Sequence, residues 1–202
     1  MSLIRFFELL TKFGDQSFIL PFALAVAAAL WMGEARREAR TWLLAIGMTL
    51  GVVLLLKLVF VPCGHLLPGW GLRSPSGHAA AGFAAFGGYA VLEAKLNRPA
   101  WQKWAILSAG FAFAALIAFS RLIVHAHSAP EVVLGSLVGL IAPAILLWQI
   151  KPQTKPAIAN PLALAPLLPL ALLLLFNGRA LPIEQHITAF AVAMTRAWGF
   201  CI

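Results

Sequence analysis

Six long apolar runs divide the sequence, and short polar segments separate them. The runs cover about residues 17–32, 42–61, 77–93, 103–122, 131–150 and 160–176. Each is close to the roughly 20 residues that an α-helix needs to cross the hydrocarbon core of a bilayer. A helix satisfies its own backbone hydrogen bonds, which an isolated strand in lipid cannot do. The pattern therefore predicts an all-α bundle of about six transmembrane helices.

The two ends of the chain have a different pattern. In residues 3–13, apolar side chains alternate with Arg5, Glu8 and Lys12 at helical spacing. This alternation predicts an amphipathic helix that lies in the membrane interface. A cleaved signal peptide is not expected, because the apolar run begins only after this amphipathic segment. Residues 183–202 are apolar but interrupted by ionisable side chains, so they lie on the outer surface or form a seventh span.

Composition agrees with a membrane protein. Of the 202 residues, 61% are hydrophobic and only 11% are charged, whereas soluble domains carry about 25% charged residues. A soluble enzyme, a disordered chain and a nucleic-acid binder are therefore excluded. Six spans with short loops fill this length, so we expect one domain over residues 1–202. The two cysteines, Cys63 and Cys201, form no disulfide framework or metal site by spacing, and nothing in the sequence pairs them.

The basic residues predict an orientation. The net charge is +8, and eight of the fifteen basic residues fall in the three loops that alternating spans place on one side: Arg36, Arg37, Arg40, Lys95, Arg98, Lys103, Lys151 and Lys155. The positive-inside rule makes that side cytoplasmic. Tryptophans gather at the same ends, as an interfacial aromatic belt would: Trp31, Trp42, Trp101, Trp104 and Trp148.

Glycines four residues apart occur in two of the runs, Gly47 with Gly51 and Gly135 with Gly139. Small residues at this spacing let helices approach closely in lipid. We therefore expect both pairs to serve helix packing rather than chemistry.

Polar residues at membrane depth are the candidates for chemistry, because their burial in lipid is costly. The six-span topology places all of them at the outer ends of spans or in outer loops: Lys57, Arg73, Ser74, Ser76, His78, Ser120, Arg121, His125, His127 and Glu131. Cations and a helix N-terminus suit a phosphate group. Two histidines can supply a nucleophile and an acid. The set has neither a carboxylate cluster for magnesium nor a thiolate set for zinc. These residues predict metal-independent phosphoryl transfer at the outer membrane surface.

Two segments carry a resemblance to a known family: Ser74-Pro75-Ser76-Gly77-His78, and Ser120-Arg121-Leu122-Ile123-Val124-His125-Ala126-His127-Ser128-Ala129-Pro130-Glu131. They resemble the second and third signature motifs of the type 2 phosphatidic acid phosphatase superfamily. That family includes membrane lipid phosphatases and shares its fold with soluble acid phosphatases and vanadium haloperoxidases. The resemblance runs from about residue 57 to residue 139, and it implies a catalytic core at about residues 42–150.

The sequence departs from the family pattern in two places. The first motif reads Lys-(six residues)-Arg-Pro, but Gly64 and His65 follow Lys57 where the arginine and proline belong. The third motif closes on an aspartate, and here Glu131 stands in its place. Glutamate keeps the charge but adds a methylene, so its reach to the histidine differs.

The resemblance implies a role for each matching residue. His127 would attack phosphorus and form a phosphohistidine, Glu131 would orient it, and His78 would protonate the leaving oxygen and later activate water. The phosphate oxygens would be held by four groups that follow the motifs: Lys57, Ser76, the Gly77 amide and Arg121.

Two assignments have rivals. His125 is the rival nucleophile, but the residue four positions beyond it is Ala129 rather than an acid. Arg73 is the other basic residue of the outer loop and lies three residues before Ser76. We expect it to replace the missing arginine of the first motif at the phosphate. The alternative is that Arg73 binds anionic headgroups or caps the loop.

The implied function is dephosphorylation of an amphipathic lipid phosphate or diphosphate, with the lipid and the bilayer as partners and with no metal or cofactor. Undecaprenyl diphosphate, phosphatidic acid, phosphatidylglycerol phosphate and lipid A phosphates all fit. The expected location is the bacterial inner membrane, with the site facing the periplasm. Two alternatives stay open: a phosphotransferase that passes the group to another lipid, and an inactive relative that binds or moves a phospholipid.

Overall fold

The computed structural model describes residues 3–63, 72–96, 98–152, 161–167, 169–171 and 183–198, and within them it contains helices and no strand. The predicted all-α class is confirmed for this part of the chain. Among the described residues, three units are long and apolar enough to cross a membrane: α3 (Arg36–Cys63), α6 (Ala100–Ile123), and α7 (Ala129–Gly139) with α8 (Ile141–Gln149).

The expected number of six spans is not confirmed. A fourth span is reached only if α1 (Leu3–Thr11), η1 (Lys12–Gly14) and α2 (Gln16–Met32) are counted as one unit, which bends by 47°. Of the predicted run at 160–176, the structure describes residues 161–167 and 169–171, and this part begins with a short 3-10 turn, η5 (Pro161–Leu164), rather than with a helix of spanning length. The bundle therefore has three or four helices of spanning length among the described residues.

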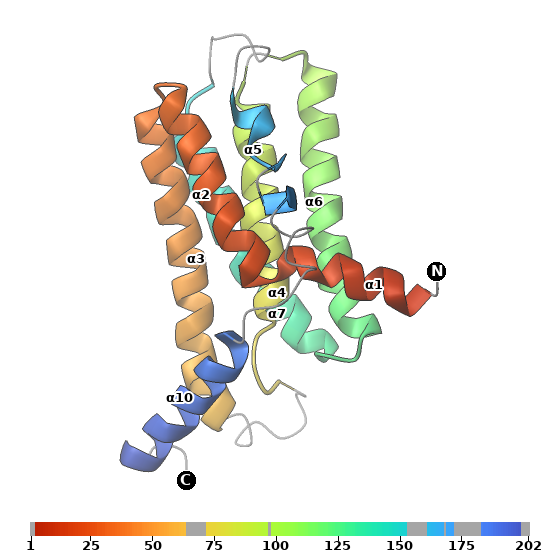
Figure 1. Ribbon diagram of the computed structural model, residues 1–202, viewed down its shortest axis with the longest axis vertical. Helices are drawn as coiled ribbons and strands as arrows, with labels where there is room; N and C mark the ends of the chain where they lie inside the picture. Colours follow the sequence, from red (N-terminus) through yellow and green to blue (C-terminus); the bar gives the residue numbers. More distant parts are fainter. Residues whose placement is uncertain are drawn as a thin grey trace.

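A central rod of small residues organises the bundle. α4 (Gly77–Gly82), the π-helical turn η3 (Phe83–Gly87) and α5 (Gly88–Ala94) follow one another without a break, between α3 on one side and α6 on the other (Figure 1). Many of its alanines are completely buried, because neighbouring helices approach its backbone closely. The N-terminal end of this rod carries the predicted second motif.

The glycine pairs differ from expectation in one helix. A Cβ atom at Gly135 of α7 would lie 2.3 Å from the Ser76 carbonyl oxygen, and one at Gly139 would lie 2.7 Å from the Ala80 carbonyl oxygen. The packing role predicted for this pair is confirmed. The same role for Gly47 and Gly51 of α3 is wrong for the part of the chain that the structure describes, since a Cβ atom there would meet none of those residues within 4 Å.

The position of Trp42 also differs from the prediction. Its side chain is completely buried, and its Nε1 donates a hydrogen bond to the Ala23 carbonyl at 2.8 Å. It therefore joins α3 to α2 instead of lying in an aromatic belt. The other four tryptophans of the predicted belt are exposed, as an interfacial position requires.

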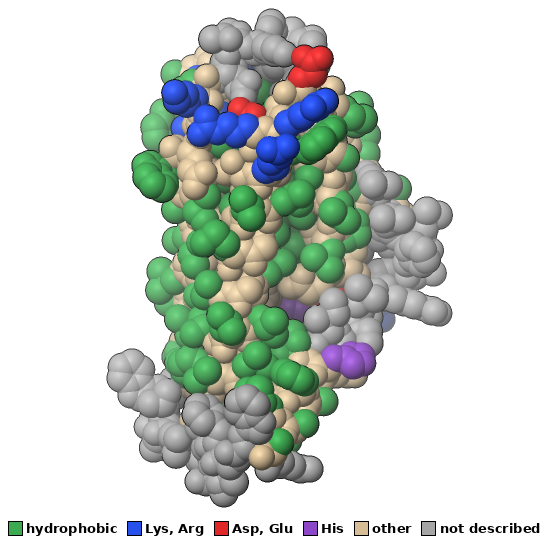
Figure 2. Space-filling view, turned by 90° about the vertical axis from the view of Figure 1, so that its left-hand side faces the viewer, with side chains coloured by type: hydrophobic (Ala, Val, Ile, Leu, Met, Phe, Trp, Pro, Cys, Tyr) green, Lys and Arg blue, Asp and Glu red, His purple; other side chains and the backbone are tan. Residues whose placement is uncertain are grey.

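The two ends of the bundle differ in charge. On the face drawn in Figure 2, Lys and Arg side chains gather at one end, hydrophobic side chains cover the middle, and histidines lie toward the other end. α1 lies across the bundle axis near the histidine end, while α10 (Ile183–Trp198) packs beside the C-terminal end of α3 (Figure 1). α10 is not among the helices able to cross a membrane, so a seventh span is not supported.

Candidate active site

A single carboxylate, that of Glu131, joins the two sequence motifs. Glu131 lies in the first turn of α7 and is 6% exposed. Its Oε2 lies 2.9 Å from His127 Nδ1 and accepts the Ser128 backbone N–H at 3.0 Å. Its Oε1 accepts the backbone N–H groups of Arg73 at 2.8 Å and Ser74 at 2.9 Å. The longer side chain of glutamate therefore reaches both the histidine and the loop that precedes α4.

The partner of Nδ1 decides which tautomer of His127 is favoured. An ionised carboxylate can only accept hydrogen bonds, so Nδ1 carries the proton and Nε2 keeps its lone pair. Burial lowers the pKa of His127, the hydrogen bond to Glu131 opposes that shift, and the Arg121 charge adds to it. The net result is a pKa below its usual 6.5, so at neutral pH the ring is uncharged and suited to nucleophilic attack.

The end of α6 sets the position of His127. The chain turns at His125, which has a positive φ of 52°. The Arg121 carbonyl then accepts the N–H groups of Ala126 at 3.0 Å and His127 at 3.3 Å. His125 itself is exposed at the tip of this turn. The structure thus brings His127, and not His125, against the carboxylate.

The start of α4 is held by the same glutamate. The Ser76 backbone N–H donates to the Glu131 carbonyl oxygen at 3.0 Å, and the buried Ser76 hydroxyl accepts the Ala79 N–H at 3.4 Å as the N-cap. α4 begins at Gly77, and His78 follows in its first turn. The N-terminus of α4, with its partial positive charge, is therefore fixed beside the start of α7.

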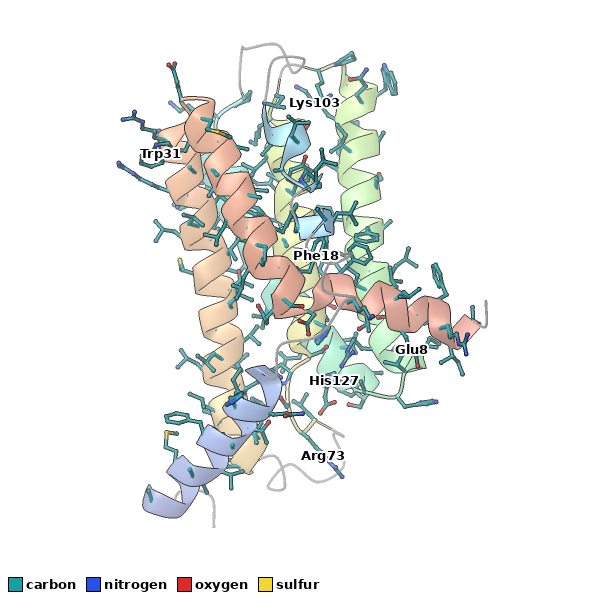
Figure 3. The ribbon with its side chains drawn as sticks, viewed as in Figure 1. Glu8, Phe18, Trp31, Arg73, Lys103 and His127 are labelled. Carbon is teal, nitrogen blue, oxygen red and sulfur yellow. The ribbon has the colours of Figure 1, made fainter. Side chains whose placement is uncertain are left out.

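The predicted phosphate-binding cations occupy three different environments. Lys57 is 2% exposed on α3. Arg121 of α6 donates from Nη1 to the Thr11 hydroxyl at 2.8 Å. Arg73 is exposed, and its side chain points away from His127 (Figure 3). The structure joins the Arg73 backbone to the site, while a phosphate contact by its guanidinium stays a prediction.

A pocket of about 220 Å³ lies next to His78. One part of its lining is polar, with Asp15, Gln16, Lys57, Gly77 and His78. The rest is apolar, with Leu20, Leu50, Val53, Leu54 and Ile187. The described residues hold no group of three or more His, Cys, Asp or Glu side chains that could bind a metal ion.

Three features of this region were missed from the sequence. His78 Nε2 lies 3.6 Å from Asp15 Oδ2, and Arg121 donates a hydrogen bond to Thr11. Asp15 and Thr11 both precede the first predicted apolar run, far from His78 and Arg121 in the sequence. The spacing of Asp15 and Ser17 could have predicted the N-cap of α2, but nothing in it indicates His78. Cys63 is disulfide-bonded, which corrects the expectation that the cysteines are unpaired. The other cysteine, Cys201, lies outside the described residues.

Comparison with known proteins decides the family. The model of the PAP2 superfamily matches residues 60–155. The chain belongs to the PAP2 superfamily. Its match includes His78, Arg121, His127 and Glu131, and it begins just after Lys57. PAP2 members are phosphatases, so the chain is assigned as a hydrolase of phosphorylated substrates.

One similar curated protein comes from Klebsiella pneumoniae and is described as an uncharacterized 22.5 kDa protein in the cps region. It is 30% identical over 197 residues, which cover 93% of this chain and 90% of that protein. The similarity therefore extends through both ends of the PAP2 match. No solved structure matches the chain.

Proposed function

We propose that this PAP2 protein hydrolyses the phosphomonoester or diphosphate of an amphipathic lipid at the outer face of the membrane. The proposal rests above all on the contact between Glu131 and His127 Nδ1. That contact leaves Nε2 as the nucleophile, and the same carboxylate holds the loop that leads to His78. A nucleophile in the turn between α6 and α7 and an acid on α4 are thereby held by one carboxylate.

The reaction proceeds in two steps. His127 Nε2 forms a bond to phosphorus while the bond from phosphorus to the lipid oxygen breaks, and His78 gives that oxygen a proton. Water then attacks the phosphohistidine, His78 takes its proton, and inorganic phosphate and the dephosphorylated lipid leave. Lys57, Arg121 and the start of α4 at Ser76 and Gly77 stabilise the charge on the phosphoryl oxygens.

The pocket beside His78 favours a lipid over a soluble phosphate ester. Its polar lining includes Lys57 and His78, and its apolar lining comes from α2, α3 and Ile187 of α10. A phosphate at the polar part would place its attached hydrocarbon chain against Leu50 and Leu54. Burial of that chain supplies binding free energy that a soluble ester lacks.

Two observations support an outward-facing site. On the face drawn in Figure 2, Lys and Arg side chains gather at the end opposite the histidines, and basic loops stay in the cytoplasm of bacterial membranes. Cys63, at the end of α3 on the side of the site, is disulfide-bonded. Disulfides persist in the periplasm and are rare in the cytosol. Together they favour the inner membrane with the site in the periplasm.

Phosphate release from a lipid panel tests the proposal. Purified protein would be given phosphatidic acid, phosphatidylglycerol phosphate, undecaprenyl diphosphate and lipid A in mixed micelles with excess chelator. We expect turnover of at least one lipid, retained in chelator and inhibited by vanadate, because the chain supplies its own nucleophile and cations. Loss of turnover on chelation, restored by magnesium, would contradict metal independence.

Two control measurements separate the alternatives. In ¹⁸O-labelled water, a hydrolase incorporates the label into free phosphate, whereas a phosphotransferase delivers unlabelled phosphate to a second lipid. Absence of turnover on every lipid, with retained lipid binding, would favour the inactive relative. The His125→Ala variant controls for damage to the loop, because His125 shares the turn with His127 but is exposed, whereas His127 lies against Glu131.

A further inference from the structure

The bend between α1 and α2 reaches into the site from a part of the chain that precedes the PAP2 match. We name residues 11–15 the elbow: it contains the end of α1, η1, and Asp15 ahead of α2. Two of its side chains contact proposed catalytic or phosphate-binding residues, through Asp15 with His78 and Thr11 with Arg121. Figure 3 shows this segment crossing the bundle just above His127.

The two oxygens of Asp15 have different partners. Oδ1 accepts the Ser17 backbone N–H at 2.8 Å and the Ser17 hydroxyl at 2.5 Å, which makes Asp15 the N-cap of α2. Oδ2 lies 3.6 Å from Nε2 of His78. Capping alone needs only the first oxygen, and Asn would provide it equally well. The charge on the second oxygen is therefore the feature that an N-cap does not explain.

Close backbone contact holds the elbow on His78. A Cβ atom at Gly14 would lie 3.0 Å from the His78 carbonyl oxygen, 3.1 Å from His78 Cβ and 2.7 Å from Ile117 Cγ2. Only glycine permits this approach without a shift of the neighbours. The position of Asp15 next to the ring is thus set by packing, and it does not depend on the ion pair itself.

We propose that Asp15 is a positioning residue that stabilises the protonated form of His78, the form that donates a proton to the leaving lipid oxygen. This inference rests on the proposed function. Both ring nitrogens of an imidazolium carry protons, so a carboxylate facing Nε2 favours this form without consuming the second proton. The side chains of His78 and Asp15 are 19% and 13% exposed, so water screens the pair only partly.

The elements that pack against α4 carry cations that disfavour a charged His78. Lys57 on α3 lines the same pocket, Arg121 on α6 is held against the elbow, and Lys12 lies within η1. These cations disfavour a further positive charge on His78. Glu131 on α7 is already engaged with His127 and three backbone N–H groups, and α2 contributes no charged residue. Asp15 thereby offsets the effect that these phosphate-binding cations have on the charge of His78.

The test compares Asp15→Asn with Glu8→Gln, which removes the same charge from an exposed position on α1. Asparagine keeps the N-cap, so the variant should fold and retain its thermal midpoint. For a lipid phosphate we expect a roughly 10- to 100-fold fall in kcat, which is less than the about 10²- to 10⁴-fold of a whole general acid, because His78 itself remains in the variant. The alkaline limb of the pH profile should move to lower pH, because His78 loses its proton earlier. Glu8→Gln should match the wild type in both.

The leaving group gives a second readout. An aryl phosphate with an acidic phenol leaves without a proton, so Asp15→Asn should change its rate much less than the rate for the lipid. In a His78→Ala background, Asp15→Asn should cost nothing further on the lipid. Three outcomes would overturn the proposed role of Asp15 while leaving the proposed function intact. They are an equal loss of rate on the lipid and the aryl phosphate, an alkaline limb that does not move in Asp15→Asn, or additive losses of rate in the double variant. A His78→Ala variant with wild-type lipid turnover would overturn the acid assignment in the proposed function as well.

Discussion

Two buried glutamates lie at opposite ends of the central helical rod, and their partners differ. Glu93, in the last turn of α5, pairs with Arg98 and lies 3.3 Å from the Tyr89 hydroxyl, which also contacts the Leu162 carbonyl at 3.1 Å. Glu131, in the first turn of α7, pairs with His127 and with backbone N–H groups. The two residues are 5% and 6% exposed, so burial does not distinguish them.

The difference lies in what each partner can do. Arginine keeps its charge at all accessible pH values, so the Glu93 pair can only hold α5 to the segments around it. Histidine exchanges its proton near neutral pH and offers a second nitrogen to a substrate. A buried carboxylate therefore indicates function here through the chemistry of its partner and not through its depth in the fold.

The largest effect should come from exchanging each carboxylate for its amide. Glu131→Gln places an N–H donor toward His127 and Ser128, so the favoured tautomer of His127 is lost and kcat should fall about 10³- to 10⁴-fold. Glu93→Gln should leave kcat within about twofold and lower the free energy of unfolding by about 1–3 kcal/mol. Lipid turnover and thermal unfolding of both variants check the pair. Similar kcat losses in the two variants would show that the partner of the buried glutamate does not decide its role in catalysis.

A second effect concerns the charge next to His127. Arg121 lowers the pKa of His127, so Arg121→Gln should raise it. Because His127 attacks only when neutral, the acidic limb of the kcat/KM profile should move to higher pH. Loss of the phosphate contact should also reduce kcat about 10²-fold. The profile measured from pH 4.5 to 8 checks the sign, and a limb that moves to lower pH would contradict the arrangement.

A substitution with a smaller expected effect tests how closely α7 approaches α4. Gly135→Ala would place Cβ 2.3 Å from the Ser76 carbonyl oxygen, so the helices must separate. We expect a loss of about 1–3 kcal/mol of stability with reduced turnover. Gly51→Ala is the matched control, since its Cβ meets nothing within 4 Å. It should be neutral or gain about 0.5–1 kcal/mol from helix propensity. Thermal midpoints in one detergent compare the two, and equal midpoints would exclude the close contact.

The sequence was informative where chemistry depends on local spacing. The segments 74–78 and 120–131 predicted the family, and the spacing of four residues between His127 and Glu131 correctly favoured this histidine over His125 as the carboxylate's neighbour. The apolar runs predicted helices, yet hydrophobic length alone does not say which helices pass through lipid and which are buried by others. The rod of α4 and α5 is covered by its neighbours, and the described residues contain three or four helices long and apolar enough to span.

Long-range partners could not be predicted from one sequence. Asp15 and Thr11 belong to a segment whose amphipathic pattern indicates only an interface, and their contacts with His78 and Arg121 arise from the bend after α1. Trp42 has the residue type and the position in the sequence that are typical of an aromatic belt. Its hydrogen bond to the Ala23 carbonyl, however, depends on how α2 packs on α3. Arg73 shows the same limit, because its backbone reaches Glu131 while its side chain faces outward.

The most direct test of the account is to trap the phosphorylated enzyme. Wild-type protein would be mixed with ³²P-labelled lipid phosphate and quenched within milliseconds in alkaline detergent, because the phosphorus–nitrogen bond of phosphohistidine is labile in acid. Mass spectrometry should place the label on His127, with label retained in His125→Ala and absent from His127→Ala. Label that persists in His127→Ala, or turnover of the wild type with no labelled protein at any quench time, would contradict His127 as the nucleophile.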